Sequence, residues 1–250
     1  MRYLIKFSYD GSSFSGFQKQ KGLRTVEGCL ENAASKLNNS PVKINATGRT
    51  DKGVHAKCQY ANFDLSINAT LKGIKRALNS NLPEDIHVID VYNVRDDFNA
   101  RYEVKEKTYK YYLNMGEYDP IKRNYVYQYC YKLDVEAIAD AIKYFIGEHD
   151  FRAFVTDNVD KDNCVRVISD ASIERKGDTL IFIFTGNGFM RYEVRNLVGA
   201  LLRVGQGKDK PIRVKEILDS KVRCGGLTAK AEGLYLENIE FKDNSFEKIG

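Results

Sequence analysis

Apolar and polar residues alternate along residues 2–9, RYLIKFSY, and this alternation predicts the first strand of the chain. A helix is expected to begin after Thr25, whose hydroxyl group can cap it, and to continue to about Leu37. The apolar positions that recur at helical spacing there are Leu30, Ala33, Ala34 and Leu37. The other elements predicted for this part of the chain are strands at 42–47, 56–64 and 86–94 and a helix at 69–80.

A similar order of elements begins again after about residue 98. Asp134 can cap a helix that continues to Phe145, and an apolar stripe predicts another helix over 190–204. The remaining predicted elements are strands at 98–114, 125–132, 164–175, 179–185 and 234–241 and a short helix at 212–220. Strands and helices mix without strict alternation, which favours an α+β fold with antiparallel sheets. The repeated order indicates two lobes with a boundary near residue 105.

Composition limits the class of protein. The chain has 250 residues with 39 Lys and Arg against 34 Asp and Glu, and the resulting net charge of +5 permits a polyanionic partner without requiring one. Five scattered cysteines and three histidines show no zinc-site spacing and no disulfide framework. The sequence contains no signal peptide and no apolar run of about 20 residues. We therefore expect a soluble, cytoplasmic protein with no membrane partner.

The segment NATGRTDKGVHAK, residues 45–57, concentrates charged side chains around two glycines. Asp51 could serve only to form a turn between two strands. Alternatively, the loop presents a carboxylate with Arg49 and Arg195 as possible partners. With an ordinary pKa of ~3.9, this carboxylate suits nucleophilic attack or stabilisation of a developing cation better than general-base work. The residue types alone leave both interpretations open.

The sequence lacks the residue patterns of other common catalytic and ligand-binding sites. His55 follows the loop, but no Ser/His/Asp, Cys/His or metal-ligand pattern includes it, so a structural role is the simpler interpretation. The glycines of GNGF, residues 186–189, match neither a phosphate-binding loop nor a dinucleotide-binding fingerprint. We therefore expect any reaction to need no cofactor and no metal.

Aromatic and basic residues provide a weaker signal for nucleic acid. Tyr125, Tyr127, Tyr129 and Tyr131 alternate, so a strand would place them on one face, as half-buried core or as a platform for stacking bases. Short basic runs contain Lys19, Lys21 and Arg24; Lys72, Lys75 and Arg76; Lys105, Lys107 and Lys110; and Lys208, Lys210 and Arg213. Each run is compatible with a solvated surface, but together they favour a surface that follows phosphates.

The loop GRTDKGVH resembles the G-R-T-D-x-G-V-H motif of the TruA family, tRNA pseudouridine synthases that modify the anticodon stem-loop. The resemblance covers nearly the whole chain and includes segments in family order. These segments are SYDGSSFSGFQKQ, RTVEGCLE, ALNSNLP, FNAR, KTYKYYL, GEHDFRAF, CVRVI, GNGFMRYEVRNLVGALLRVG and TAKAEGLYL. A catalytically silent RNA-binding protein on the same scaffold is the alternative, and the presence of Asp51 disfavours it. An unrelated α+β structural protein would leave the ordered motifs unexplained.

The resemblance implies a fold and a reaction. It implies two ferredoxin-like lobes, residues 1–104 and 105–250, whose antiparallel sheets join across a central active-site cleft. It also implies a homodimer that binds the tRNA anticodon stem-loop. The implied reaction is the isomerisation of uridine to pseudouridine at tRNA positions 38, 39 and 40, with an aspartate nucleophile and without cofactor or metal. Whether the aspartate attacks the ribose C1′, attacks C6 of the base or assists glycal formation stays open.

The family motifs also imply roles for individual residues. Asp51 is the implied catalytic aspartate. Tyr109 would stack on the target uracil and accept the proton that leaves C5, while Leu234 would pack beside the base. Arg195 would pair with Asp51. Arg49 would contact RNA or help to part the target base from its stack.

At three positions the chain departs from the usual family pattern. Phe17 stands where many members have Trp, and Lys230 stands where Pro is common. Glu193 precedes Val194 where Met is commoner. Because residues two apart on a helix do not face each other, we expect Glu193 to point away from Arg195.

Overall fold

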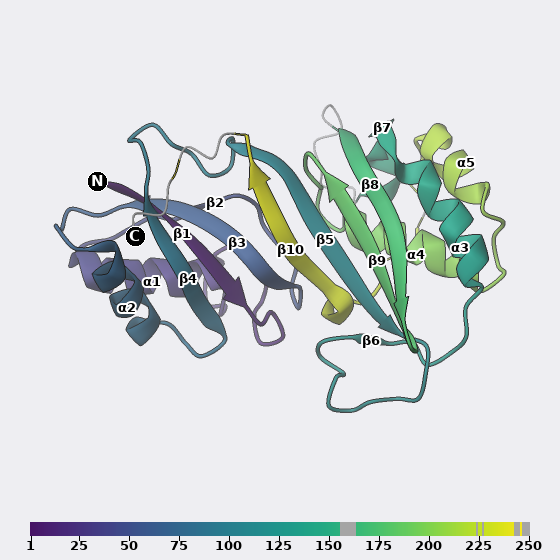
Figure 1. Ribbon diagram of the computed structural model, residues 1–250, viewed down its shortest axis with the longest axis horizontal. Helices are drawn as coiled ribbons and strands as arrows, with labels where there is room; N and C mark the ends of the chain where they lie inside the picture. Colours follow the sequence, from purple (N-terminus) through teal and green to yellow (C-terminus); the bar gives the residue numbers. More distant parts are fainter. Residues whose placement is uncertain (156–163, 224, 227, 243–245, 247–250) are drawn as a thin grey trace. The chain divides into compact units, whose positions relative to one another are not determined.

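The computed structural model describes residues 1–155, 164–223, 225–226, 228–242 and 246, and Figure 1 labels its helices and strands. The chain divides into two compact units. Unit 1 comprises Met1–Lys105 and Leu236–Gly250, and unit 2 comprises Glu106–Tyr235. The chain therefore enters unit 2 after Lys105 and returns to unit 1 at Leu236.

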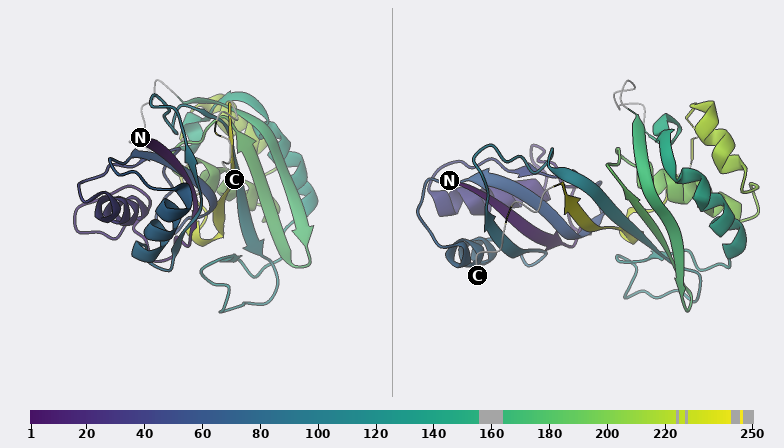
Figure 2. Two further views of the ribbon diagram at one scale, coloured as in Figure 1. Left: turned by 60° about the vertical axis from the view of Figure 1, so that its left-hand side comes forward. Right: turned by 45° about the horizontal axis from the view of Figure 1, so that its top comes forward.

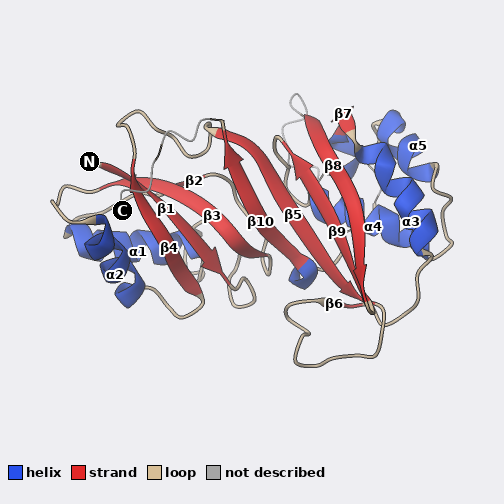
Figure 3. Ribbon diagram, viewed as in Figure 1, coloured by secondary structure: helices blue, strands red, loops and turns tan. Residues whose placement is uncertain are grey.

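Unit 1 is an antiparallel sheet with two helices (Figure 3). Its elements are β1 (Arg2–Tyr9), α1 (Val26–Asn38), β2 (Asn45–Ala46), β3 (His55–Asp64), α2 (Leu71–Asn81), β4 (Ile86–Asn93) and most of β10 (Leu234–Phe241). The strand order is β4-β1-β3-β10, and β2 also pairs with β3. Strand β1 is antiparallel to both β3 and β4, and β2 is antiparallel to β3.

The two helices of unit 1 begin where the sequence predicts. Thr25 accepts a hydrogen bond from the Gly28 N–H at 3.3 Å and caps α1, and Thr70 caps α2 in the same way through Gly73. The two helices contact each other and lie on the same face of the sheet (Figures 1 and 2). Their apolar stripes supply the buried side chains Val26, Leu30, Ala33, Ala34, Ile74 and Leu78.

The strand predicted at 42–47 is shorter in the structure. Only Asn45 and Ala46 pair with β3. Val42 and Ile44 are buried, but the Val42 N–H donates to the Ser35 hydroxyl of α1 at 2.9 Å instead of joining the sheet. The apolar pattern thus predicted burial correctly and strand pairing only in part, because a side chain satisfies one backbone donor.

The strands of unit 2 are mostly antiparallel. Its elements are β5 (Val104–Asn114), β6 (Tyr127–Gln128), α3 (Val135–Ile142), η1 (Lys143–Phe145), β7 (Gly147–Asp150), η2 (Phe151–Phe154), β8 (Val165–Lys176), β9 (Thr179–Gly186), α4 (Glu193–Gly205), α5 (Arg213–Ser220) and η4 (Ala231–Gly233). The strand order is β5-β9-β8-β7, and β6 is parallel to β5. Helix α3 contacts α4 and β8. The predicted α+β class with antiparallel strands is confirmed.

Two element boundaries differ from the prediction, and one strand was not predicted. The strand expected from residue 98 begins only at Val104, because turns closed by Arg95 and Asn99 occupy residues 95–102. The helix expected over 190–204 begins at Glu193, after a turn. The short strand β7 was not predicted.

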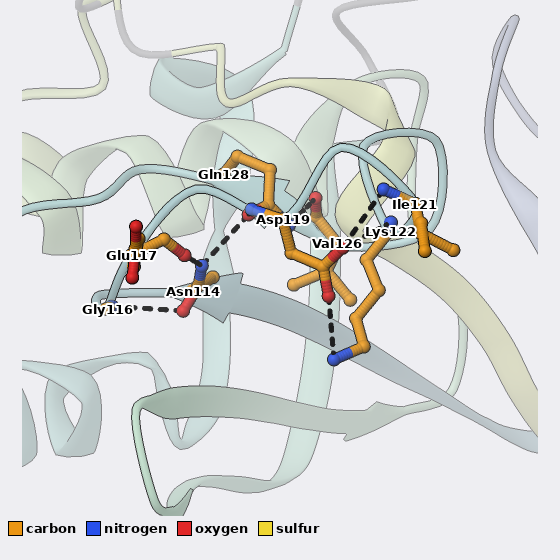
Figure 4. Close-up of polar contacts among 8 residues, drawn as sticks. All are labelled: Asn114, Gly116, Glu117, Asp119, Ile121, Lys122, Val126 and Gln128. Atoms are coloured by element: carbon orange, nitrogen blue, oxygen red, sulfur yellow. Dashed lines mark hydrogen bonds and ion pairs between the residues drawn. The ribbon is translucent and has the colours of Figure 1, made fainter.

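The predicted strand at 125–132 is wrong. Only Tyr127 and Gln128 pair with β5, and the segment before them is a long loop (Figure 4). The Asn114 side-chain amide and the Asp119 backbone N–H both donate to the Gln128 side-chain oxygen, at 2.9 and 3.0 Å, and so hold the loop. Cys130 has a φ of 64°, which breaks the extended alternation. The four tyrosines therefore form no single strand face.

Candidate active site

The loop between β2 and β3 carries Asp51 and Arg49. Asp51 is half-buried and Arg49 is exposed. The Val54 N–H donates to Asp51 O at 3.1 Å, and Gly53 has a φ of 79°, so a tight turn follows the carboxylate. Asp51 therefore takes part in turn geometry through its backbone, as the first interpretation expects.

Side-chain hydrogen bonds from β1 and β3 hold the part of this loop that precedes Asp51. The hydroxyl groups of Tyr9 and Thr50 lie 2.7 Å apart, and the Gln59 amide donates to Gly48 O at 3.1 Å. Gln59 also accepts a hydrogen bond from the Thr47 hydroxyl. Burial raises the pKa of Tyr9 far above its ordinary value, so its phenol stays protonated. The sheet thus fixes the loop through side chains that never ionise near neutral pH.

Residues 10–17 pack against the same loop. The Phe17 N–H donates to Thr50 O at 3.1 Å, and the Gly11 N–H donates to His55 Nδ1 at 3.0 Å. A Cβ atom at Gly11 would lie only 2.0 Å from Val54 O, so no other residue fits without a backbone shift. His55 Nδ1 also lies 3.2 Å from Asp10 Oδ1. These contacts give His55, which is buried, the structural role expected of it.

Tyr109 lies on β5, opposite Phe184 of β9, and only 8% of it is exposed. The Phe189 ring meets it edge-on, with centroids 5.2 Å apart and an interplanar angle of 82°. Edge-to-face contacts of this kind fix the orientation of an aromatic ring. The Tyr109 ring is therefore held from the side by the segment that precedes α4.

Arg195 lies on the first turns of α4 and is tied to the segment before η4. Its Nε donates to Ala229 O at 2.7 Å, and the Ala229 N–H donates back to Arg195 O at 3.0 Å. Its guanidinium carbon lies 5.1 Å from the centre of the Tyr192 ring, within range of a cation–π interaction. The side chain is thus oriented by two neighbours within unit 2.

Leu234 follows η4 and is buried. The glycine before it is required by close packing, because a Cβ at Gly233 would lie 2.6 Å from Tyr112 O and 2.8 Å from Tyr111 Cζ. The Tyr111 hydroxyl donates to Lys230 O at 2.8 Å. Strand β5 therefore holds the segment that ends in Leu234.

The predicted site residues divide between the units. Asp51 and Arg49 belong to unit 1, whereas Tyr109, Arg195 and Leu234 belong to unit 2. The turn at residues 189–192 contacts both Tyr109 and Arg195, so unit 2 relates these two residues through one segment. The pairing of Arg195 with Asp51 stays a prediction.

A family model described as tRNA pseudouridine synthase matches residues 5–103 and 141–242. The chain belongs to this family. The synthase from Streptococcus agalactiae serotype Ia, named tRNA pseudouridine synthase A, is 42% identical over 247 residues, which cover 97% of this chain and 96% of that one. Proteins of the same name from Streptococcus pyogenes serotype M3 and Streptococcus mutans serotype c are also 42% identical, over 97% of this chain and all of theirs.

A solved structure titled as a Cbf5–Nop10–Gar1 complex also matches, with a TM-score of 0.35 and 14% identity over 80% of this chain and 54% of the other. This similarity is too low to bear on the present site. In the described part of the chain, no helix is long and apolar enough to cross a membrane. Among the same residues, no group of three or more His, Cys, Asp or Glu side chains is placed to hold a metal ion.

The short basic runs of the chain differ in whether their cations form ion pairs with acidic side chains. Arg24 forms a two-pronged ion pair with Asp85 at 2.7 and 2.8 Å, Lys105 pairs with Glu240, and Arg213 pairs with Glu216. The basic residues of α2 are Lys72, Lys75 and Arg76, and within the described residues none of them has an ion pair. We call these three residues the α2 cluster. It is the basic run whose positive charge is most available to phosphates.

Two residues near Arg195 could not be identified from the sequence as parts of this site. Glu193 is fully buried, and burial raises its pKa to about 8. Its side chain bonds to Met190, consistent with the expectation that it points away from Arg195. Tyr192 has a φ of 62°, which a tyrosine rarely adopts. Glu193 stood out in the sequence because Met is commoner at this position of the family, but nothing in the sequence indicated that Glu193 is buried.

Proposed function

We propose that this chain isomerises uridine to pseudouridine at positions 38, 39 and 40 of the tRNA anticodon stem-loop, with Asp51 as the nucleophile and without a cofactor. The observation that carries the proposal is the position of Asp51 in the GRTDKGVH loop, directly after residues that Tyr9 and Gln59 hold by hydrogen bonds. A carboxylate on a rigid loop is preorganised for a reaction in which positive charge develops.

The reaction is balanced without an external reagent. The bond between N1 of uracil and C1′ of ribose breaks, the base turns, and a bond forms between C5 and C1′. The proton leaves C5, and N1 gains one. Charge develops at the ribose as the first bond breaks, and Asp51 stabilises it or forms a covalent bond. The attack at C1′, the attack at C6 and the glycal route are alternatives that share this carboxylate.

Each remaining site residue has a proposed role. Tyr109 stacks on the uracil and accepts the C5 proton, and Leu234 packs beside the base so that the freed uracil turns without leaving. Arg195 pairs with Asp51 and keeps it ionised. Arg49, which is exposed, contacts the RNA backbone or helps to part the target base from its stack.

We also propose that each unit contains a ferredoxin-like lobe, and that the protein has a central active-site cleft, forms a homodimer and is cytoplasmic. The order β4-β1-β3-β2 with two intervening helices supports the first lobe, because it is the strand order of a split βαβ fold. Sedimentation velocity tests the homodimer, and a species with the mass of one chain at micromolar concentration would contradict it.

The position of the modified base is tested with three tRNAs, each with uridine at only one of positions 38, 39 and 40 of the anticodon stem-loop. Chemical labelling of pseudouridine followed by primer extension maps the product. We expect product at each of the three positions. Product only elsewhere in the tRNA would contradict the proposed specificity, and bound tRNA with no product at all would favour a silent RNA-binding protein.

A further inference from the structure

Glu193 is the first residue of α4, and its side chain is 0% exposed. An acidic residue in the first turn of a helix is ordinarily solvated and interacts favourably with the helix dipole. Burying a carboxyl group costs free energy unless its contacts compensate. The proposed reaction does not use this carboxyl group, so its contacts need another explanation.

Two hydrogen bonds connect Glu193 with Met190. The Met190 N–H donates to Glu193 Oε2 at 2.7 Å, and the Glu193 N–H donates to Met190 O at 3.2 Å. The side chain and the backbone of Glu193 thus close the same turn. Within the described residues, Glu193 Oε1 is buried and has no hydrogen-bond partner. Its single side-chain bond is therefore directed to the turn.

The turn between these residues contains an unusual backbone conformation. Tyr192 has φ 62° and ψ −3°, in the left-handed region that non-glycine residues adopt only where the surrounding structure imposes it. The Tyr192 ring lies close to two cations, with the guanidinium carbons of Arg191 and Arg195 4.8 and 5.1 Å from its centre. The closed turn therefore determines what contacts Arg195.

The other end of the same turn contacts Tyr109. Phe189 immediately precedes Met190, and its ring meets Tyr109 at 5.2 Å. One short segment thus touches both proposed site residues of unit 2, Tyr109 through Phe189 and Arg195 through Tyr192. Glu193 closes that segment from inside the unit.

We propose that Glu193 is a positioning residue that locks the turn at residues 189–193, so that Phe189 orients Tyr109 and Tyr192 orients Arg195 for catalysis. The inference rests on the proposed function, which gives Tyr109 and Arg195 their roles. Glu193 itself touches neither substrate nor reacting atoms. It acts through the turn alone.

Because Glu193 can ionise, a positioning role should appear in the pH dependence of the reaction rate, whereas a merely structural role should not. Desolvation raises its pKa to about 8, opposed by the Met190 N–H and by Arg166 of β8. Among the described residues, Cys164, just before β8, also interacts electrostatically with Glu193. The carboxyl group is therefore neutral at pH 7 and becomes a buried anion above about pH 8. Gln has the same shape, can accept the Met190 bond and never ionises, whereas Ala cannot accept the bond.

The first test measures single-turnover tritium release from tRNA containing 5-tritiated uridine, with wild type, Glu193→Gln and Glu193→Ala. The matched controls are Glu216→Gln and Glu216→Ala, at an exposed glutamate in the first turn of α5. We expect Glu193→Ala to lower the rate constant at least about tenfold with the tRNA Kd within about threefold. Glu193→Gln should restore the rate to within about threefold at pH 7. A wild-type rate constant for Glu193→Ala would overturn the proposal.

The pH profile decides the matter if Glu193→Ala does not fold. We expect the ratio of the wild-type rate constant to that of Glu193→Gln to fall at least about threefold between pH 7 and 9.5, because groups common to both proteins cancel. Superimposable profiles would overturn the proposal. Failure of the proposed function would look different, since wild type itself would then release no tritium while binding tRNA.

Discussion

The Tyr9 hydroxyl on β1 lies 2.7 Å from the hydroxyl of Thr50, the residue that directly precedes Asp51. Both groups are buried, so the bond connects the central part of the unit 1 sheet to the loop that carries the candidate nucleophile. A loop held in this way keeps its carboxylate in place without help from the substrate.

Tyr9→Phe removes this bond and retains the ring. We expect a loss of about 1–2 kcal/mol in the free energy of unfolding, because the Thr50 hydroxyl stays buried with one partner fewer. The rate constant for pseudouridine formation should fall about tenfold with an unchanged tRNA Kd. Tyr3→Phe is the control, since within the described residues the Tyr3 hydroxyl, on the same strand, has a hydrogen bond only to Met1 Sδ, at 3.6 Å. Equal effects of the two substitutions would contradict this role of Tyr9.

Gly11→Ala tests the contact between residues 10–17 and the Asp51 loop. A Cβ atom there would lie 2.0 Å from Val54 O, so one of the two backbone segments has to move. We expect a loss of at least about 3 kcal/mol in urea unfolding, or an insoluble protein. Gly225→Ala, where a Cβ meets nothing within 4 Å, should change stability by less than about 0.5 kcal/mol. A stable Gly11→Ala protein with full activity would show that the loops need not pack this way.

The α2 cluster of Lys72, Lys75 and Arg76 should contribute to tRNA binding through phosphates. Replacing all three with Gln should weaken binding at low salt and flatten the dependence of log Kd on log salt concentration by up to about 2–3 units, because fewer counterions are released. Arg24→Gln, which removes a cation already paired with Asp85, is the control and should flatten it much less. Binding titrations at four salt concentrations measure both slopes. An unchanged slope for the triple variant would remove α2 from the RNA surface.

Glu193 should make folding stability depend on pH. Its pKa is raised from 4.5 in the unfolded chain to about 8 in the native state, so the native state binds the extra proton between these values. The stability that neutral Glu193 provides is therefore complete below about pH 4.5 and is lost as the pH rises towards 8. The difference in unfolding free energy between Glu193→Gln and wild type should grow by up to about 1.4 kcal/mol per pH unit in this window and level off above it. A constant difference from pH 5 to 9 would contradict the raised pKa.

Local patterns predicted those parts of the fold that depend on local chemistry. Thr25 and Asp134 cap the helices that the sequence assigns to them, and their apolar stripes are buried. The alternating tyrosines at 125–131 misled the prediction, because Gln128 bonds to Asn114 and Asp119 of the preceding loop and Cys130 turns the chain. These bonds join residues 14 and 9 positions apart, and an alternating pattern of apolar residues does not indicate them.

Local patterns likewise predicted some features of the candidate site and not others. The motif around Asp51 indicated the loop, and the structure adds the support from Tyr9 and Gln59, which lie on neighbouring strands. Glu193 stood out in the sequence only as a departure from the family. Its burial and the left-handed conformation of Tyr192 arise from packing around α4, which no local pattern encodes.

The most direct test of the central claim is tritium release from tRNA with 5-tritiated uridine, measured in parallel with tRNA binding for wild type and Asp51→Asn. Asp219→Asn, at an exposed carboxylate on α5, is the control for the loss of a negative charge. We predict release by wild type and Asp219→Asn, and none by Asp51→Asn, although all three bind tRNA within a few-fold of one another. Undiminished release by Asp51→Asn would contradict the assignment of the reaction to this carboxylate.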